Sequence, residues 1–311
     1  MVDILLAVYN GEKYIKQQLD SIIAQTFKDW RLIVYDDGSC DDTAQILKDY
    51  ILKYKGRIVF YKGLNNSKSA VFSFSKLLKL SSSKYVAFCD HDDVWHKDRL
   101  TFSVEAMKDM ELKYGDIPIL IHTDLYIVDE FLKIKNKSMI KSQCLGFKAK
   151  SLQELIVQNN ITGCTVLVNR SLVNICGNIP NSALMHDWWL GLVAASFGKI
   201  KFLNAKTVYY RQHSSNCVGA KNVRSFSYIF GRIFGKSAVK RSIDNVFLQC
   251  EAFLNIYGAL LPKDKKKILE DYISINRFSK LRRIVKLIVG GYLKFGFFRK
   301  LGQFFYICIK V

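Results

Sequence analysis

The cluster Asp90-His91-Asp92-Asp93 places three carboxylates and an imidazole within four consecutive residues. Carboxylate oxygens are the ligands that Mg²⁺ and Mn²⁺ prefer, and these cations usually keep positions open for water and for substrate phosphates. Two carboxylates two residues apart, Asp90 and Asp92, could face the hydroxyl groups of a ligand and a metal-bound diphosphate, respectively. The alternative is a solvated acidic turn that caps a helix beginning near Asp98. By its spacing alone, the cluster fits both interpretations.

The elements around this cluster follow from the spacing of the apolar residues. Four short apolar runs have the pattern of strands buried on both faces, and the segments between them have helical periodicity. Alternating strands and helices favour a parallel sheet with right-handed crossovers. The predicted strands are residues 2–9, 31–35, 57–61 and 85–89, and the predicted helices are 13–24, 42–54 and 71–80, the second with Asp41 or Asp42 as its N-cap.

Polar residues follow three of the predicted strands at the point where each strand ends. They are Tyr9-Asn10, Asp36-Asp37 and the acidic cluster that starts at Asp90. Ligands of parallel sheets bind at the carboxyl ends of the strands, so these residues are expected to converge on one edge. Carboxylates brought together repel one another unless a cation or hydrogen-bond donors offset their charge. This edge is therefore the predicted place for a metal.

Beyond residue 98 the order of the elements changes. Residues 124–143 are polar and are expected to be irregular, and Asp187 stands near the start of the last predicted helix. The predicted helices are 100–110, 151–158 and 186–197, and the predicted strands are 117–122, 164–169 and 207–210. A boundary is expected near Gly219, which separates a domain of residues 1–219 from a basic C-terminal region of residues 220–311.

Six segments stand in an order and spacing shared with a known family: ILLAVYNGEKYIKQQLDSIIAQTF, YDDGSCDDT, FCDHDDVWHKDRL, ITGCTVLVNR, HDWWLGLVAASFG and YRQHSSN. From about residue 1 to 220, the chain resembles the family 2 inverting glycosyltransferases, and in particular their rhamnosyltransferase-like branch. The resemblance implies the GT-A fold, an α/β fold in which a Rossmann-like αβα sandwich has a mixed, mostly parallel sheet. A helical, basic appendage would follow it.

The resemblance also implies a binding site for a nucleoside-diphosphate sugar. Ala7, Tyr9 and Asn10 match the residues that form the cradle for the nucleotide base. Asp37 matches a residue that binds the edge of the base, and Asp36 would lie beside it. Near residues 65–74 the chain departs from the family pattern, which leaves the identity of the donor open.

The family's DxD motif maps onto the acidic cluster. Asp90 and Asp92 occupy its outer positions, where Asp92 would hold a divalent cation, Mn²⁺ or Mg²⁺, and Asp90 the hydroxyls of the donor. His91 stands between them and either contacts the donor or faces the solvent. His213 matches a late histidine that reaches the metal or the diphosphate, although a structural role is the alternative. Lys68 could supply positive charge to the diphosphate.

Asp187 matches the catalytic base of the family. Inverting transfer needs a group that accepts the proton of the acceptor hydroxyl, and a carboxylate can do so from within about 3 Å. The alternative role of Asp187 is to offset the dipole of the helix that it begins. Of Trp188 and Trp189, both candidates for binding the acceptor, one is expected to pack in the core and the other to line the acceptor site. The sequence does not say which.

Charge divides the chain unevenly. Residues 221–311 carry 19 Lys/Arg and 5 Asp/Glu, a net charge of +14, which leaves +6 of the total of +20 for residues 1–220. In the tail, basic residues interrupt apolar and aromatic runs, a pattern typical of helices that lie in an anionic membrane interface. Ordinary packing of these helices on the domain is the alternative, and both can hold together. The tail has no nucleic-acid-binding motif, so nucleic acid is not an expected partner.

The remaining features concern location and activity. The eight cysteines form no CxxC pair, which favours reduced cysteines in a cytosolic protein, and no stretch of ~18 uncharged apolar residues predicts a membrane span. The beginning of the sequence does not have the pattern of a signal peptide. We therefore expect an enzyme on the inner face of the cell membrane that transfers sugar from a UDP- or dTDP-sugar, including dTDP-rhamnose, to a lipid-linked glycan of a bacterial surface polysaccharide. The alternative is a degenerate scaffold protein, against which the presence of Asp90, Asp92 and Asp187 together argues.

Overall fold

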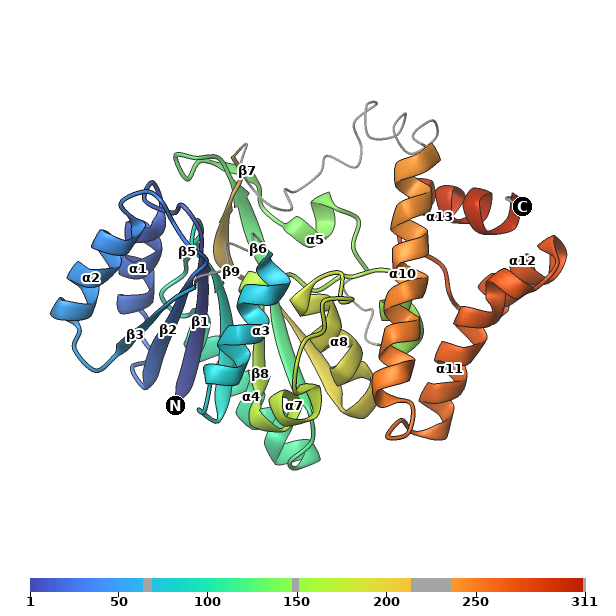
Figure 1. The fold of residues 1–311 in the computed structure, drawn as a ribbon, viewed down its shortest axis with the longest axis horizontal. Coiled ribbons are helices and arrows are strands. Elements are labelled where there is room, and N and C mark those ends of the chain that lie inside the picture. The colour runs from blue at the N-terminus through green and yellow to red at the C-terminus, as the bar shows by residue number, and fades with distance from the viewer. Residues whose placement is uncertain (64–68, 147–150, 214–235, 310–311) are drawn as a thin grey trace.

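The computed structural model describes residues 1–63, 69–146, 151–213 and 236–309 (Figure 1). Its described strands form one mixed sheet in the order β3-β2-β1-β4-β8-β6-β9-β5, with β7 paired to β6. The strands are β1 (Val2–Val8), β2 (Trp30–Asp36), β3 (Ile58–Lys62), β4 (Tyr85–Asp90), β5 (Val94–Trp95), β6 (Ile119–Val128), β7 (Ile134–Asn136), β8 (Leu167–Asn169) and β9 (Lys199–Arg211).

Helices cover both faces of this sheet, and a further group of helices lies at one end of the molecule (Figure 1). The first set is α1 (Ile15–Ile23), α2 (Thr43–Lys53), α3 (Ala70–Leu80), α4 (Arg99–Tyr114), α5 (Met139–Ser142), α6 (Leu152–Val157), α7 (Arg170–Cys176) and α8 (His186–Phe197). The C-terminal group is α10 (Lys236–Tyr257), α11 (Lys263–Ile273), α12 (Lys280–Val289) and α13 (Phe297–Phe304), with short helical turns at η1 (Gly163–Thr165), η2 (Ser274–Arg277) and η3 (Phe305–Ile309).

The first half of the chain has the predicted order of elements. Strands β3, β2, β1 and β4 are mutually parallel, so their carboxyl ends meet at one edge. Ala7 of β1 pairs with Tyr35 of β2 on one side and with Asp90 of β4 on the other. The predicted α/β architecture is confirmed, and the register brings the polar strand ends together. Near the predicted N-cap of α2, the Asp41 carboxylate, rather than that of Asp42, accepts the backbone N–H of Thr43, at 3.1 Å.

The second half differs from the prediction in several places. Strand β9 spans Lys199–Arg211, where the prediction gives residues 207–210, and the sequence pattern predicts neither β5 nor α7. The predicted strand 164–169 is only three residues long, because Gly163–Thr165 form a 3₁₀ turn before β8. The segment expected to be irregular contains the end of β6, the strand β7 and the helix α5. Buried polar partners explain why the segment 124–143 is ordered: Ser138 donates a hydrogen bond to Asp124, and the hydroxyls of Thr123 and Thr207 lie 2.6 Å apart. Hydrogen-bonded polar residues can line a strand interior that apolar periodicity does not reveal.

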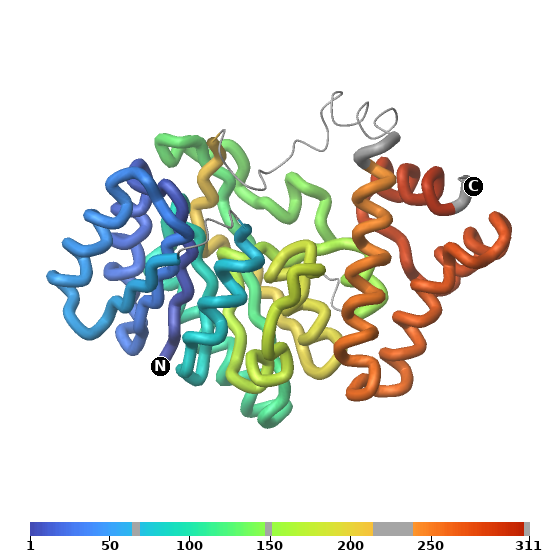
Figure 2. Tube along the Cα trace, viewed as in Figure 1, coloured from blue at the N-terminus to red at the C-terminus, as the bar shows by residue number. Residues whose placement is uncertain are grey.

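The hydrophobic core is continuous between the sheet's helical layer and the C-terminal helices. Trp189 of α8 is fully buried, and its ring meets that of Phe253 of α10 edge-on, at 5.1 Å between centroids. The tube in Figure 2 shows α10 running beside the sheet domain and the other C-terminal helices outside it. The proposed boundary at Gly219 lies outside the described residues, so the division into two domains stays a prediction.

Candidate active site

The acidic cluster forms the turn between β4 and β5. Asp93 is fully buried, and its Oδ1 accepts the backbone N–H of Arg211 at 3.1 Å. The guanidinium of Arg211 in turn donates from Nε to the backbone oxygen of Asp92, at 2.8 Å, and from Nη2 to the side chain of Gln17, at 2.5 Å. These bonds tie the end of β9 to the turn and to α1. The turn is therefore held by β9, which is itself tied to α1, and the three segments are far apart in the sequence.

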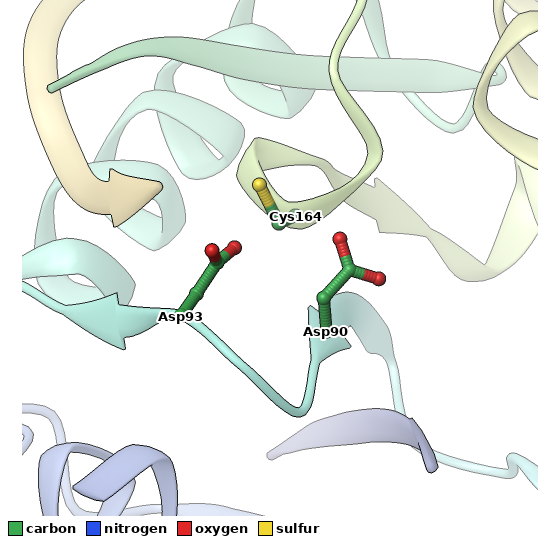
Figure 3. Close-up of side chains that lie close together, drawn as sticks. All are labelled: Asp90, Asp93 and Cys164. Atoms are coloured by element: carbon green, nitrogen blue, oxygen red, sulfur yellow. The ribbon is translucent and has the colours of Figure 1, made fainter. Parts of the chain in front are cut away.

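Asp90, Asp93 and Cys164 point toward one another, with one possible ligand atom from each lying within 4.8 Å of the others (Figure 3). Burial, together with the negative charges of Asp92 and Asp187, raises the pKa of Asp90 to about 7. Burial and the charges of Asp92 and Asp90 likewise raise the pKa of Asp93. Negative charge on these carboxyl groups is thus unfavourable, and a bound cation would reduce the repulsion between them.

Asp92 and His213 form the pair that the sequence predicts as metal ligands. Nε2 of His213 lies 3.0 Å from Oδ2 of Asp92. The imidazole also contacts the ring of Tyr14, the residue just before α1, at 4.9 Å between centroids. Carboxylate and imidazole atoms at this separation are a donor set that Mn²⁺ accepts, and Mg²⁺ accepts the carboxylates. The residues therefore fit a divalent cation, and Asp90 lies at the same turn.

The predicted nucleotide residues lie at the ends of β1 and β2. Oδ1 of Asp36 accepts the backbone N–H and the hydroxyl of Ser39, at 2.8 and 2.6 Å. Its Oδ2 is buried and has no hydrogen-bond partner within the described part of the chain. Asp37 is buried next to it, and its backbone N–H donates to the oxygen of Val8. A buried carboxylate oxygen without a donor is a feature of a site completed by a ligand.

Asn10 links the loops that follow β1 and β2. Its φ of 48° is in the left-handed region, which asparagine tolerates better than most residues. Its backbone N–H donates to Ser39, and its side-chain oxygen accepts the N–H of Cys40, both at 2.9 Å. Tyr9 and Ala7 precede it at the end of β1, and each is partly exposed. The structure thus brings together the five residues predicted to hold the nucleotide, at the ends of β1 and β2.

The two remaining predicted donor contacts have different outcomes. His91 is partly exposed and lies against Gly11, where an added Cβ would come within 2.8 Å of the imidazole. The structure therefore places His91 between the acidic turn and the loop after β1, where its contact with the donor stays a prediction. Lys68 lies outside the described residues.

Asp187 is the second residue of α8, and its carboxylate is buried. Oδ1 accepts the side-chain N–H of Asn159 at 3.0 Å and the backbone N–H of Trp188 at 2.6 Å. Burial raises the pKa of Asp187 to about 6, while those two donors and the backbone N–H of Gly163 oppose the rise. The carboxylate is consequently ionised at neutral pH and still basic enough to accept a proton. The charge of Asp187 acts on Asp90, so the predicted base and the acidic cluster lie near one another.

The structure separates the two predicted acceptor tryptophans. Trp189 is fully buried, so it is the tryptophan that packs in the core, and it is ruled out as the candidate that binds the acceptor. Trp188 is partly exposed, and its ring nitrogen donates to the backbone oxygen of Leu155 at 2.6 Å. Trp188 keeps the acceptor role as a prediction.

Asn159 and Gly163 are site residues that the sequence did not single out. Both belong to the loop after α6 and donate hydrogen bonds to Asp187. An added Cβ on Gly163 would come within 2.6 Å of Nε2 of His186, whose ring lies 4.0 Å from that of Phe74. Burial lowers the pKa of His186 to about 3, so this histidine is neutral. The segment ITGCTVLVNR includes Gly163 and begins two residues after Asn159, but only the fold shows that this region contacts Asp187.

Arg99 is a second residue that sequence reasoning missed. It is fully buried, donates to the backbone oxygens of Cys164 and Phe88, at 2.7 and 3.1 Å, and lies over the ring of Trp95. Burial lowers its pKa to about 10, which leaves it a cation at neutral pH. Its positive charge opposes the rise in the pKa of Asp90. Arg99 thus offsets part of the negative charge from beneath the site.

An α/β sheet with an acidic turn and a buried carboxylate at its carboxyl edge is the arrangement of a GT-A transferase. The family model described as "Glycosyl transferase family 2" matches residues 3–172, and the chain belongs to that family. The confirmed fold and family are those that the sequence motifs predict.

Several known proteins are similar to this chain. The dTDP-rhamnosyl transferase RfbG of Shigella flexneri is 26% identical over 229 residues, which cover 69% of this chain and 74% of that protein. The Escherichia coli WfaP, named as a UDP-Glc:α-D-GlcNAc-diphosphoundecaprenol β-1,3-glucosyltransferase, is 26% identical over 220 residues, or 70% and 79% of the two chains. The crystal structure of S. aureus TarS 1-349 with UDP-GlcNAc matches with a TM-score of 0.60 at 16% identity, covering 99% of this chain and 81% of that one. This last likeness shows the shared fold.

Proposed function

We propose that this glycosyltransferase moves a sugar from a nucleoside-diphosphate sugar, with inversion at the anomeric carbon, to a hydroxyl of a lipid-linked glycan. The observation that carries the proposal is the buried carboxylate of Asp187, held by Asn159 and the Trp188 backbone at the edge that also bears Asp90. In-line attack requires a base on the acceptor side and a charged leaving group on the other, and this edge provides a place for both.

The residues of the site divide the chemistry. Asp187 accepts the proton of the acceptor hydroxyl, and Trp188, the next residue, contacts the acceptor. Asp37 binds the edge of the base with Asp36 beside it, and Asp90 holds hydroxyls of the donor. A divalent cation at Asp92 and His213, when bound, offsets the negative charge that develops on the departing diphosphate.

The donor and acceptor classes are proposed from the relatives. RfbG is named for dTDP-rhamnose and WfaP for UDP-glucose, so a UDP- or dTDP-sugar, including dTDP-rhamnose, is the proposed donor. WfaP is also named for an acceptor linked to diphosphoundecaprenol. A lipid-linked acceptor used in surface polysaccharide synthesis would place the enzyme on the cytoplasmic face of the cell membrane. The partners are then the donor, the lipid-linked glycan and an anionic membrane surface.

A thermal-shift screen with UDP-, dTDP- and GDP-sugars tests the donor and the metal together. A ligand at a hundred times its Kd stabilises a protein by about 2.7 kcal/mol, so a true donor should raise the Tm clearly when Mn²⁺ or Mg²⁺ is present. EDTA should remove both this shift and the transfer of sugar.

Asp92→Asn is expected to lose the metal-dependent part of the shift. Asp109→Asn is its matched control, because Asp109 is an exposed carboxylate on α4 whose ion pair to Lys201 is long, at 3.9 Å. Full transfer activity in EDTA would contradict the metal role. If none of the UDP- and dTDP-sugars raised the Tm, the proposed donor class would be contradicted.

A further inference from the structure

Helices α12 and α13 each expose an apolar face to solvent. On α12 the exposed residues are Leu281, Val285, Ile288 and Val289, and on α13 and η3 they are Phe297, Leu301 and Phe305. Leu281, Val285 and Ile288 are four and three residues apart, and Val289 is four residues from Val285. Phe297, Leu301 and Phe305 are four residues apart, so each set lies on one side of its helix. Leu281, Val289 and Phe297 are 73%, 81% and 74% exposed. Large apolar side chains gathered in this way on neighbouring helices mark an interaction surface.

The same part of the chain is strongly cationic. Residues 272–311 contain nine Lys/Arg and no Asp or Glu. The nearest preceding carboxylate, Asp271, already pairs with Lys286 at 2.6 Å. Exposed basic residues flank the apolar face of α12 at Lys280 and Arg282, and Lys300 is exposed on α13. Apolar and basic side chains on one short helix are typical of helices that lie in a lipid interface.

The two helices form one unit. Arg283 of α12 donates a hydrogen bond to the backbone oxygen of Ile307, at 3.0 Å, and Gln303 of α13 donates to the oxygen of Tyr292, at 2.7 Å. Leu287 and Ile307 are buried, so the inner faces of the helices are already covered. Figure 1 shows α12 and α13 together at the end of the molecule away from β1 to β3.

This unit is also fixed to the transferase domain near the active site. Nη1 of Arg299 donates to the backbone oxygen of Gln143 at 2.7 Å, and the backbone N–H of Phe295 donates to the side chain of Gln158 at 2.9 Å. Gln158 directly precedes Asn159, which holds the base Asp187. A surface that these helices bind is thereby held at a set position relative to the catalytic edge, which is the edge of the sheet that bears Asp90 and lies beside Asp187.

We infer that the exposed apolar faces of α12 and α13, the C-terminal docking surface, bind the interface of an anionic lipid bilayer. The inference rests on the proposed function in one respect: a lipid-linked acceptor gives the docking its purpose. The apolar side chains enter the boundary between head groups and acyl chains, and the basic residues contact anionic head groups. Within the described residues no helix is long and apolar enough to cross a bilayer.

Charge favours a bilayer over a second copy of the chain as the occupant of this surface. A symmetric dimer through α12 and α13 would bring together two surfaces that carry positive charge and no carboxylate from residue 272 onward. Like charges juxtaposed across an interface disfavour association. An anionic bilayer is complementary both to the charge and to the apolar stripes.

Co-sedimentation of the full chain with vesicles tests the inference without donor or acceptor. One set of vesicles is pure phosphatidylcholine, and the other is equal parts of phosphatidylcholine and phosphatidylglycerol. The wild-type protein should sediment with the second set. The neutral triple variant Leu281→Ser, Val289→Ser, Phe297→Ser should bind at least about tenfold more weakly, because it removes apolar side chains and no charge.

The matched control is Leu52→Ser, Leu112→Ser, Phe131→Ser, which changes three apolar residues that are 67%, 91% and 84% exposed outside the docking surface. It should bind the anionic vesicles like the wild type, and thermal melting should show that both triple variants are folded. A docking-surface variant that binds as tightly as the control overturns the inference. A second result would also overturn it: light scattering shows that the wild type and the control variant are dimers and that the docking-surface variant is a monomer. Because the donor-induced thermal shift is measured without lipid, failure of the proposed function would be seen separately.

Discussion

The catalytic edge and the C-terminal docking surface treat charge and apolar area in opposite ways. At the edge, the fold buries Asp36, Asp93 and Asp187 and leaves an oxygen of Asp36 and one of Asp93 without a hydrogen-bond partner within the described residues. At the docking surface, the fold exposes apolar side chains such as Val289 and Phe297. Each arrangement costs folding free energy by itself, since carboxylates prefer water and apolar groups avoid it.

The comparison shows which kind of ligand would offset the folding free-energy cost of each region. The edge is complementary to a small, highly charged ligand, because buried donors such as the Arg211 backbone and the cation Arg99 already fix its geometry. The docking surface is complementary to an extended, apolar and anionic partner. Substitutions in the two regions should therefore separate transfer chemistry from lipid binding.

Asp187→Asn should have the largest effect, a loss of sugar transfer with no change in lipid binding. Positioned general bases contribute roughly 10²- to 10⁴-fold, and an amide cannot accept the proton, so kcat should fall by that factor. The donor-induced thermal shift and vesicle binding should stay at the wild-type level. Sugar transfer to an acceptor, measured by product formation, provides the check, and unchanged turnover would remove Asp187 as the base.

Gly163→Ala should have the next largest effect. The new Cβ would meet Nε2 of His186 at 2.6 Å and Oδ2 of Asp187 at 3.4 Å, so the loop or the base must shift. A displacement of the base by about 1 Å can cost on the order of 10²-fold in kcat, while donor affinity changes little.

Gly302→Ala in α13 is the matched control for Gly163→Ala, because its nearest neighbour, Val239, is an ordinary 3.9 Å away. The control should keep full activity. Equal turnover of the two alanine variants would mean that the Gly163 loop does not position the base.

The smallest expected effect is on stability. A carboxyl whose pKa rises from 3.8 to about 6 on folding stabilises the folded state only while it is protonated, so the free energy of unfolding falls as the pH rises through about 6. In EDTA at pH 8, Asp187→Asn should therefore be more stable than the wild type, by up to about 3 kcal/mol. Denaturant titrations at pH 8 and at pH 4 measure this, and a difference that does not shrink at the lower pH would contradict the assigned shift.

The sequence by itself determined the order of β1 to β4 and the meeting of Asn10, Asp37 and Asp90 at one edge. Apolar periodicity is a local property that sets strands and helices, and parallel pairing then fixes which ends coincide. Hydrogen-bonded polar residues hid the end of β6, because Thr123, the first residue after the predicted strand, pairs with Thr207 of β9. The start of β9, residues 199–206, is half polar and mostly partly exposed, so apolar periodicity does not reveal it.

Only the tertiary structure decided which side chains face the site. It buried Trp189 against Phe253 and left Trp188 partly exposed, although the two are adjacent and chemically identical. It also brought Asn159 to Asp187, 28 residues away in the chain. Burial and long-range hydrogen bonds depend on which elements pack together, and local sequence pattern does not contain that information.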